Sequence, residues 1–252
     1  MSYHFTVSPD FPPERLSGWF IFNTWMQRQI SEGIHLEMYD SFDKQRAAIA
    51  ADQVDLIYAN PYDASMLVRE KGFVAVARPR GRSDEAIIAV RADSPVQCVE
   101  DLAPGSRVVS TGNPDVDMMG MIMLEAADLH AGNTLRVNAD TFVLVARKLL
   151  KGDADAGIFL AEAFDGLTAL TRKDLRIIVR SEISVVQHML MIGPKFRHRQ
   201  ADLAAVLVAA QDDPKAQSVT EGLGFAGWDT VAQDDVEFMI DLIDTLAFQP
   251  DS

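Results

Sequence analysis

Short apolar runs alternate along the chain with longer segments in which apolar residues recur at helical spacing. The short runs have strand length and lie at residues 3–7, 34–38, 56–59, 73–78 and 86–90. Helix-like segments separate them: one opens at Pro13 and ends at Gly33, one follows the cap signal at 39–41, and one starts at Asn60. This order predicts a mainly parallel sheet with helices on both faces.

The same alternation begins again after residues 91–105, a charged stretch with prolines that we interpret as a connection between two lobes. Strand-like runs follow at 107–110, 135–137, 156–159 and 175–179, and helix-like segments at 118–129, 141–150 and 160–170. Asp140 is the expected cap of the helix at 141–150. The strand-like run at 187–192 is expected to return to the first lobe, because helical segments follow it at 200–210, 214–223 and 231–246.

Two distant segments, residues 47–59 and 147–160, share one pattern. Each contains a helix end, a polar turn, an aspartate (Asp55 or Asp155) and a strand that ends in an aromatic residue (Tyr58 or Phe159). Two α/β lobes of similar plan are therefore implied. A small molecule commonly binds between such lobes, because strand carboxyl ends and helix amino ends converge there.

The strand at 56–59 runs directly into a helix start, with Asn60 as the cap and Pro61 at the first helical position. The unpaired backbone N–H groups and the positive end of the helix dipole favour an anion or a carbonyl oxygen over residues 60–62. Tyr58 and Tyr62 flank this position. The alternative is an ordinary βα unit whose tyrosines face the core or the solvent, and the recurrence of the pattern favours a binding site.

Composition narrows the class of protein. The chain has 252 residues, of which 48% are hydrophobic and 24% charged, as in globular proteins. Its net charge of −14 argues against a nucleic acid or an anionic membrane surface as partner, but a local cluster of backbone N–H groups can still hold a small anion. No run is apolar enough to span a membrane, and no export signal is visible. We therefore expect a periplasmic location if a signal was trimmed and a cytoplasmic one if the chain is complete as written.

Several motifs together resemble a known family. They are Ser8-Pro9 after the first strand, Asp55-Leu-Ile-Tyr-Ala-Asn-Pro-Tyr, Ala86-Ile-Ile-Ala-Val-Arg-Ala-Asp-Ser, Glu100-Asp-Leu-Ala-Pro-Gly-Ser-Arg-Val, Asp153-Ala-Asp-Ala-Gly and Gly222-Leu-Gly-Phe. This order resembles the phosphate/phosphite/phosphonate-type substrate-binding proteins of ABC importers. The resemblance implies the type II periplasmic binding protein fold, with two α/β lobes that are joined by two crossing strands. One lobe would comprise residues 1–88 and 188–252, and the other residues 89–187.

The resemblance also implies a ligand wall made by both lobes. The first lobe would contribute Ser8, Tyr39, Asn60 and Tyr62, and the second Asn113, Asp115, Asp117, Thr141, Phe142 and Phe159, with Gln187 and His188 on the returning strand. The family has serine and threonine at the turn where this chain has Asp115 and Asp117. Because two carboxylates would repel a dianionic phosphonate, we expect a ligand of lower charge, with one polar oxygen on Asn60 and a less anionic part toward the aspartates and phenylalanines.

Chemistry beyond binding has little support in the sequence. We interpret Asp115 and Asp117 as partners of a helix start rather than as metal ligands, and His188 has no accompanying nucleophile motif. We therefore expect a monomeric, non-enzymatic binding protein without cofactor or metal, whose partners are a small molecule and an ABC permease or a sensor protein. The alternatives are a cytoplasmic enzyme on the same scaffold and a ligand-sensing regulatory module.

Overall fold

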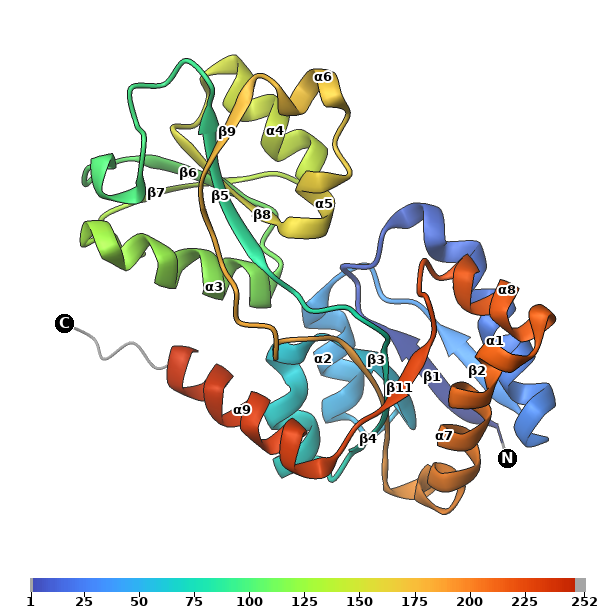
Figure 1. Cartoon of the computed structure of the whole chain (residues 1–252). Helices are drawn as coiled ribbons and strands as arrows, with labels where there is room; N and C mark the ends of the chain where they lie inside the picture. Colours follow the sequence, from blue (N-terminus) through green and yellow to red (C-terminus); the bar gives the residue numbers. More distant parts are fainter. Residues whose placement is uncertain (1, 248–252) are drawn as a thin grey trace. The chain divides into compact units, whose positions relative to one another are not determined.

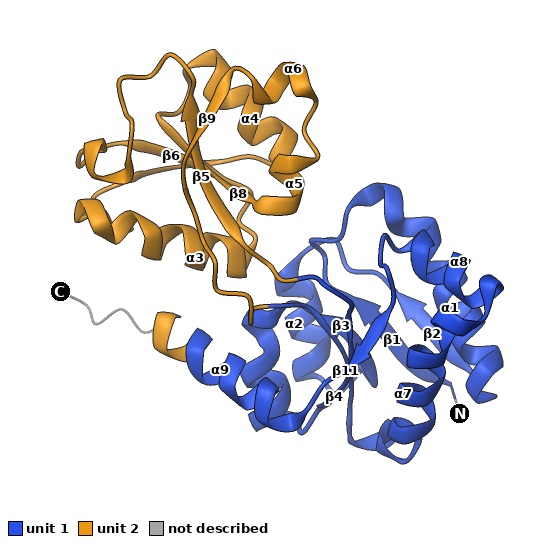
Figure 2. Cartoon of the chain, in the orientation of Figure 1, with its two compact units in different colours: residues 1–82, 187–243 blue, residues 83–186, 244–252 orange. Residues whose placement is uncertain are grey.

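The computed structural model describes residues 2–247, and the chain divides into two compact units (Figures 1 and 2). Unit 1 contains Met1–Arg82 and Gln187–Ile243, and unit 2 contains Ser83–Val186 together with the chain from Asp244 onward. The chain thus passes between the units after residues 82 and 186, and again after residue 243. The lobe borders expected after residues 88 and 187 lie close to these crossings, although the strand that begins at residue 86 belongs wholly to unit 2.

The sheet of unit 1 has the strand order β11-β4-β10-β3-β1-β2. Its strands are β1 (Tyr3–Val7), β2 (Ile34–Glu37), β3 (Leu56–Ala59), β4 (Val74–Pro79), β10 (Met189–Ile192) and β11 (Trp228–Thr230). Strand β1 pairs in parallel with β2 and β3, whereas the returning strand β10 is antiparallel to both β3 and β4. The carboxyl ends of β1 and β3 therefore meet at one edge, next to the amino end of β10.

Helices connect or follow the strands of this unit. They are α1 (Leu16–Ile30), α2 (Phe42–Ala50), α7 (Gln200–Ala209), α8 (Pro214–Gly222) and α9 (Gln233–Ala247), with short helical turns at Pro13–Arg15, Pro61–Asp63, Met66–Glu70, Pro194–Arg199 and Ala210–Asp212. Trp19, Phe22, Met26 and Ile30 recur at helical spacing on α1 and are buried in the core with Phe5 of β1. The opposite face of α1 leaves Phe20 and Ile21 exposed.

Unit 2 repeats the plan with the order β7-β6-β8-β5-β9. Its strands are β5 (Ala86–Arg91), β6 (Arg107–Ser110), β7 (Leu135–Asn138), β8 (Ala156–Leu160) and β9 (Leu175–Arg180). Its helices are α3 (Pro114–Leu124), α4 (Phe142–Lys151), α5 (Ala161–Asp165) and α6 (Ala169–Arg172), with turns at Val99–Asp101 and Glu125–Ala127. Strand β6 is parallel to β7 and β8, and β5 is antiparallel to β8 and β9. The order β4-β10-β3-β1-β2 of unit 1 thus corresponds to the order β9-β5-β8-β6-β7 of unit 2, with the same parallel and antiparallel pairings.

The repeated aspartates have the same structural role in the two units. Asp55, just before β3, accepts a hydrogen bond at Oδ2 from the backbone N–H of His4 at 3.0 Å. Asp155, just before β8, accepts one from the backbone N–H of Arg107 at 2.8 Å. In both cases the aspartate N–H donates back to the carbonyl of the same residue, at 2.8 Å. These aspartates therefore close the amino-terminal end of each sheet, away from the carboxyl ends at which a ligand is expected.

Two predicted elements differ from the structure, and one strand was not predicted. The helix expected at 160–170 is split into α5 and α6, because the chain turns at residues 166–168 between them. Thr141, and not Asp140, caps α4: its side chain accepts from the backbone N–H of Leu144. Strand β11 has only three residues and no apolar alternation, so the sequence pattern did not predict it. Within residues 2–247, no helix is long and apolar enough to cross a membrane.

Candidate functional site

Polar side chains gather in unit 1 where β1 and β3 end. Asn60 directly follows β3, and its Oδ1 accepts from the backbone N–H of Tyr62 at 2.9 Å, so it caps the helical turn as expected. Its Nδ2 donates to Oδ2 of Asp10, in the loop after β1, at 2.8 Å. The Asn60 amide therefore ties the two loops together.

Asp10 also pairs with His188, which lies just before β10. The His188 Nε2 is 3.1 Å from Asp10 Oδ2, and the two side chains are only 14% and 9% exposed. The imidazole stacks on the ring of Tyr58, with centroids 5.3 Å apart and planes 19° apart. Burial raises the pKa of Asp10, but the charge of His188 and hydrogen bonds from His188, Ser8 and Asn60 outweigh it, and the pKa falls to about 2.

Ser8 is completely buried between these groups and β3. Its backbone N–H donates to the carbonyl of Tyr58 at 2.8 Å. Although its hydroxyl adds to the lowering of the pKa of Asp10, Oγ makes no hydrogen bond of good geometry within residues 2–247. A buried hydroxyl in this position has the capacity to donate to a ligand oxygen.

A second buried pair supports the same edge of unit 1. Arg46 of α2 donates from Nε to Oδ1 of Asp63 at 2.7 Å, and its guanidinium lies 5.6 Å from the ring centre of Tyr62. Burial raises the pKa of Asp63, Arg46 lowers it, and the charges of Asp10 and His188 also act on it, in opposite directions. Tyr62, which is 38% exposed, is therefore held by a cation on one of its faces.

Two other residues expected in unit 1 lie outside this hydrogen-bonded group. Tyr39 is half-buried in the loop after β2, and burial raises the pKa of its hydroxyl, assisted by the charge of Glu37. Gln187 is buried, and in its favourable amide orientation Oε1 accepts from Arg78 at 2.7 Å and the amide donates to the carbonyl of Arg82 at 3.3 Å. Gln187 thus contacts the chain at the first crossing.

In unit 2 the corresponding edge lies between β6 and α3. Asp117 in the first turn of α3 accepts from Nη2 of Arg136 at 2.6 Å and from the hydroxyl of Ser110 at 3.0 Å. Burial raises the pKa of Asp117, while Arg136 and Ser110 lower it. Arg136 is on β7, the edge strand next to β6, so its cation compensates this aspartate within the unit.

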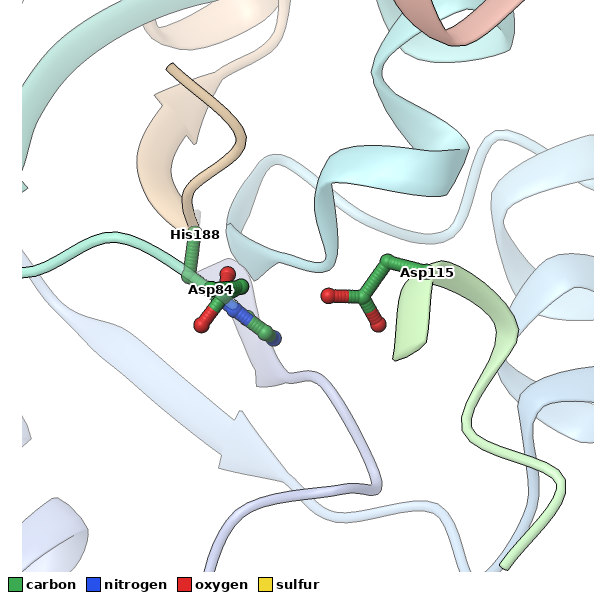
Figure 3. Close-up of side chains that lie close together, drawn as sticks. All are labelled: Asp84, Asp115 and His188. Carbon is green, nitrogen blue, oxygen red and sulfur yellow. The ribbon is translucent and has the colours of Figure 1, made fainter. Parts of the chain in front are cut away.

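Asp115 is the other aspartate of that turn, and it is completely buried. One of its carboxylate oxygens lies within 4.8 Å of a carboxylate oxygen of Asp84, in the strand-to-strand connection before β5 (Figure 3). Asn113 occupies the cap position of α3 without a side-chain cap bond. Two carboxylates therefore lie near each other at this end of unit 2.

Aromatic residues behind this edge belong to the core of unit 2. Phe159 at the end of β8 is 0% exposed and packs against Phe142 and Phe164, with ring centroids 6.3 and 5.2 Å away. Phe142 is partly buried and directly follows the Thr141 cap. Phe159, which the resemblance placed on the ligand wall, therefore has the position of a core residue that supports Phe142.

The sequence pattern did not single out Asp10, Arg46, Asp63 or Arg136. Asp10 is part of Ser8-Pro9-Asp10, whose composition is that of any turn, and the other three gain their partners only through contacts distant in sequence. A signal was present for Asp10 alone: an acidic residue immediately after the first strand lies at the edge where ligands of α/β proteins bind.

The chain has clear similarities to known proteins. A family model described as "ABC transporter, phosphonate, periplasmic substrate-binding protein" matches residues 5–236. No curated protein matches the chain. In fold it is similar to PhnD1 from Prochlorococcus marinus, solved in complex with methylphosphonate, with a TM-score of 0.81, 9% identity and 98% of each chain covered.

Two further solved structures are similar. XAC2383 from Xanthomonas citri, solved bound to ATP, has a TM-score of 0.79 and 16% identity, with 98% of this chain and 97% of that chain covered. The periplasmic aliphatic sulphonate binding protein SsuA from Escherichia coli has a TM-score of 0.67 and 13% identity, with 98% and 86% covered. These likenesses confirm the expected α/β two-lobe fold of type II periplasmic binding proteins.

Proposed function

The chain belongs to the family of periplasmic substrate-binding proteins of phosphonate ABC transporters, and on this premise we propose that it binds one small polar ligand reversibly for an ABC importer in the periplasm. The observation that carries the proposal is the extent of the family match, which includes the polar edges of both units. The family model and the solved neighbours are described as binding proteins. The enzyme and sensor alternatives find no support among them.

The charges of the two edges define the ligand we propose. Unit 1 offers the buried Ser8 hydroxyl, which can donate to an oxyanion or another polar oxygen and which lies beside the Asp10–His188 pair. In unit 2, Arg136 compensates Asp117, and Asp115 and the nearby Asp84 supply two further carboxylates. We therefore propose a ligand that carries one oxyanion group and, at its other end, a cationic or hydrogen-bond-donating group, and over which the two units close.

Calorimetric titration with a matched pair of probes tests this ligand class. Aminomethylphosphonate and methylphosphonate differ by one ammonium group, and we expect the amino compound to bind at least about tenfold more tightly, which corresponds to about 1.4 kcal/mol. Asp115→Asn should abolish the preference because it removes the carboxylate without changing the shape of the side chain. Asp117→Asn is the matched control and should keep the preference, since Asp117 is already paired with Arg136.

Two results would contradict the proposal. Methylphosphonate binding as tightly as its amino analogue would show that Asp115 does not select a cation, and binding of neither probe would exclude this ligand class. The binding role is tested separately by ³¹P NMR of the probe after prolonged incubation with the protein. We expect one unchanged phosphorus signal, and a product signal would establish an enzyme instead.

A further inference from the structure

The side chain of Glu85 holds together two segments of unit 2 through which the chain passes between the units. Glu85 lies just before β5, and its carboxylate binds the segment that follows β9. Oε2 accepts from the hydroxyl of Ser181 and from the backbone N–H of Ile183, the latter at 3.0 Å. Oε1 accepts from the backbone N–H of Ser184 at 2.6 Å. One carboxylate therefore binds three donors of a single segment.

These contacts fill an interruption in the antiparallel pairing of the two segments. Ser181, one residue beyond β9, makes two hydrogen bonds of 2.9 Å with Ala86: its N–H donates to the Ala86 carbonyl, and its Oγ accepts from the Ala86 N–H. The pairing resumes where the N–H of Asp84 donates to the carbonyl of Val186 at 2.7 Å. Between these two pairs, the segment after β9 is longer than the segment before β5.

Residues 182–185 lie opposite Glu85 alone and have no regular secondary structure. Ser184 among them has a φ of 63°, in the left-handed region that is unfavourable for a residue other than glycine. Such a conformation persists only where surrounding contacts determine it. The N–H groups of Ile183 and Ser184 both donate to the Glu85 carboxylate, which provides charge-assisted contacts of this kind.

The backbone of Glu85 is itself fixed to the sheet of unit 2. Its carbonyl accepts from the N–H of Ala161, the first residue of α5, at 2.7 Å. The next residue, Ala86, begins β5 and pairs with Leu160 of β8. The side chain of Glu85 therefore connects an irregular segment to a rigid part of the sheet.

Building on the proposed function, in which the two units close over a ligand, we propose that Glu85 is a positioning residue for this closure. It joins residues 83–86 and 181–186 into one rigid connector of unit 2, so that the backbone torsions that change on closure lie at residues 82–83 and 186–187. A rigid connector leaves a larger fraction of the free protein able to close, and the apparent affinity is proportional to this fraction.

Amide hydrogen exchange of the ligand-free chain, resolved by residue with NMR, tests the connector. We expect the N–H groups of Ile183 and Ser184 to be protected in the wild type and to exchange at least about tenfold faster in Glu85→Gln. Glutamine keeps the shape of the side chain but turns an NH₂ group toward donors. Glu182→Gln is the matched control, because it removes an exposed carboxylate from the same segment, and it should leave both exchange rates unchanged. The connector is refuted if these amides are unprotected in the wild type, or equally protected in Glu85→Gln.

Calorimetry with aminomethylphosphonate tests the role in closure. We expect the affinity to fall at least about threefold in Glu85→Gln and to stay unchanged in Glu182→Gln. Tryptophan fluorescence should show equal stability of unit 1 in both variants, since all 3 tryptophans belong to that unit. Faster exchange at Ile183 and Ser184 without any loss of affinity would refute the role in closure.

The position of the bend is tested by the amide signals of the wild type. Saturating aminomethylphosphonate should shift the signals of residues 82–83 and 186–187 and leave those of residues 183–184 in place, and the reverse pattern would refute the proposal. Wild-type protein that does not bind this probe would contradict the proposed ligand class instead. The hydrogen exchange of the ligand-free chain then decides whether Glu85 forms the connector.

Discussion

The crossing of α1 and α8 allows a sharp test of the packing in unit 1. A Cβ atom placed on Gly18 of α1 would lie 2.5 Å from the carbonyl oxygen of Gly222 and 2.9 Å from its carbonyl carbon. Both are backbone atoms of α8, so no side-chain rotation can relieve the contact. The substitution Gly18→Ala must therefore move one helix relative to the other.

The size of the effect follows from two opposing contributions. Alanine in a helix interior is favoured over glycine by about 1 kcal/mol. Overpacking of a tight contact costs about 1 to 3 kcal/mol, and the upper part of this range applies where the backbone itself must shift. We therefore expect Gly18→Ala to lower the free energy of unfolding of unit 1 by about 1 to 2 kcal/mol, and the thermal midpoint by roughly 2 to 8 °C.

Tryptophan fluorescence during urea denaturation measures the free energy of unfolding of unit 1. All 3 tryptophans of the chain, Trp19, Trp25 and Trp228, belong to unit 1, so the signal reports unit 1 even if the two units unfold separately. Gly222→Ala is the matched control at the same crossing, because a Cβ there would meet only the Cα of Gly18, at 4.0 Å. Equal stability of Gly18→Ala and wild type, or equal destabilisation by both substitutions, would refute the reasoning.

Three further outcomes follow from the contacts. The pKa of Asp10 is lowered to about 2 in the folded protein, compared with about 3.9 in the unfolded chain. The ionised carboxylate should therefore stabilise the fold fully above about pH 3.9, and this stabilisation should be lost as the pH falls toward 2. In this pH range the urea midpoint of the wild type should depend more steeply on pH than that of Asp10→Asn. Arg176→Met removes bonds to the carbonyls of Ala92, Ser94 and Val96, and should speed amide hydrogen exchange in residues 92–97, with a loss of about 1 to 3 kcal/mol by circular dichroism. Aminomethylphosphonate should reduce the radius of gyration in small-angle scattering as the units close, and unchanged curves at saturation would contradict closure.

Most of the fold could be predicted from the apolar pattern. The strands of both sheets, apart from β11, occur at the predicted runs to within a few residues, because a buried strand in such a sheet is a short continuous apolar segment bounded by turn residues. The repeat around Asp55 and Asp155 predicted two units of similar plan. The structure gives its physical cause, since each aspartate pairs with the backbone of the neighbouring parallel strand in its own unit, β1 for Asp55 and β6 for Asp155.

The candidate site was less accessible to sequence analysis. Asp117 was interpreted as a charge that a ligand would meet, but Arg136 compensates it from the neighbouring strand, a contact between residues distant in sequence. Phe159 was expected on the ligand wall. Residues on both faces of β8 are buried, so the sequence of this strand is almost continuously apolar and does not indicate which way a side chain points. The prediction of Asn60 as a helix cap is confirmed, because capping depends only on local sequence.

The two units are alike at one end of their sheets and different at the other. At the amino-terminal ends, Asp55 and Asp155 make the same two backbone contacts. At the carboxyl ends, unit 1 has a histidine–aspartate pair with a buried hydroxyl, whereas unit 2 has Asp115 beside Asp84. The amino-terminal ends of the two sheets thus share their contacts, whereas the carboxyl-terminal ends carry different polar groups. This difference is the reason for proposing a ligand whose two ends are chemically different. The paired probes, which differ only in one such end, therefore address the asymmetry of the protein directly.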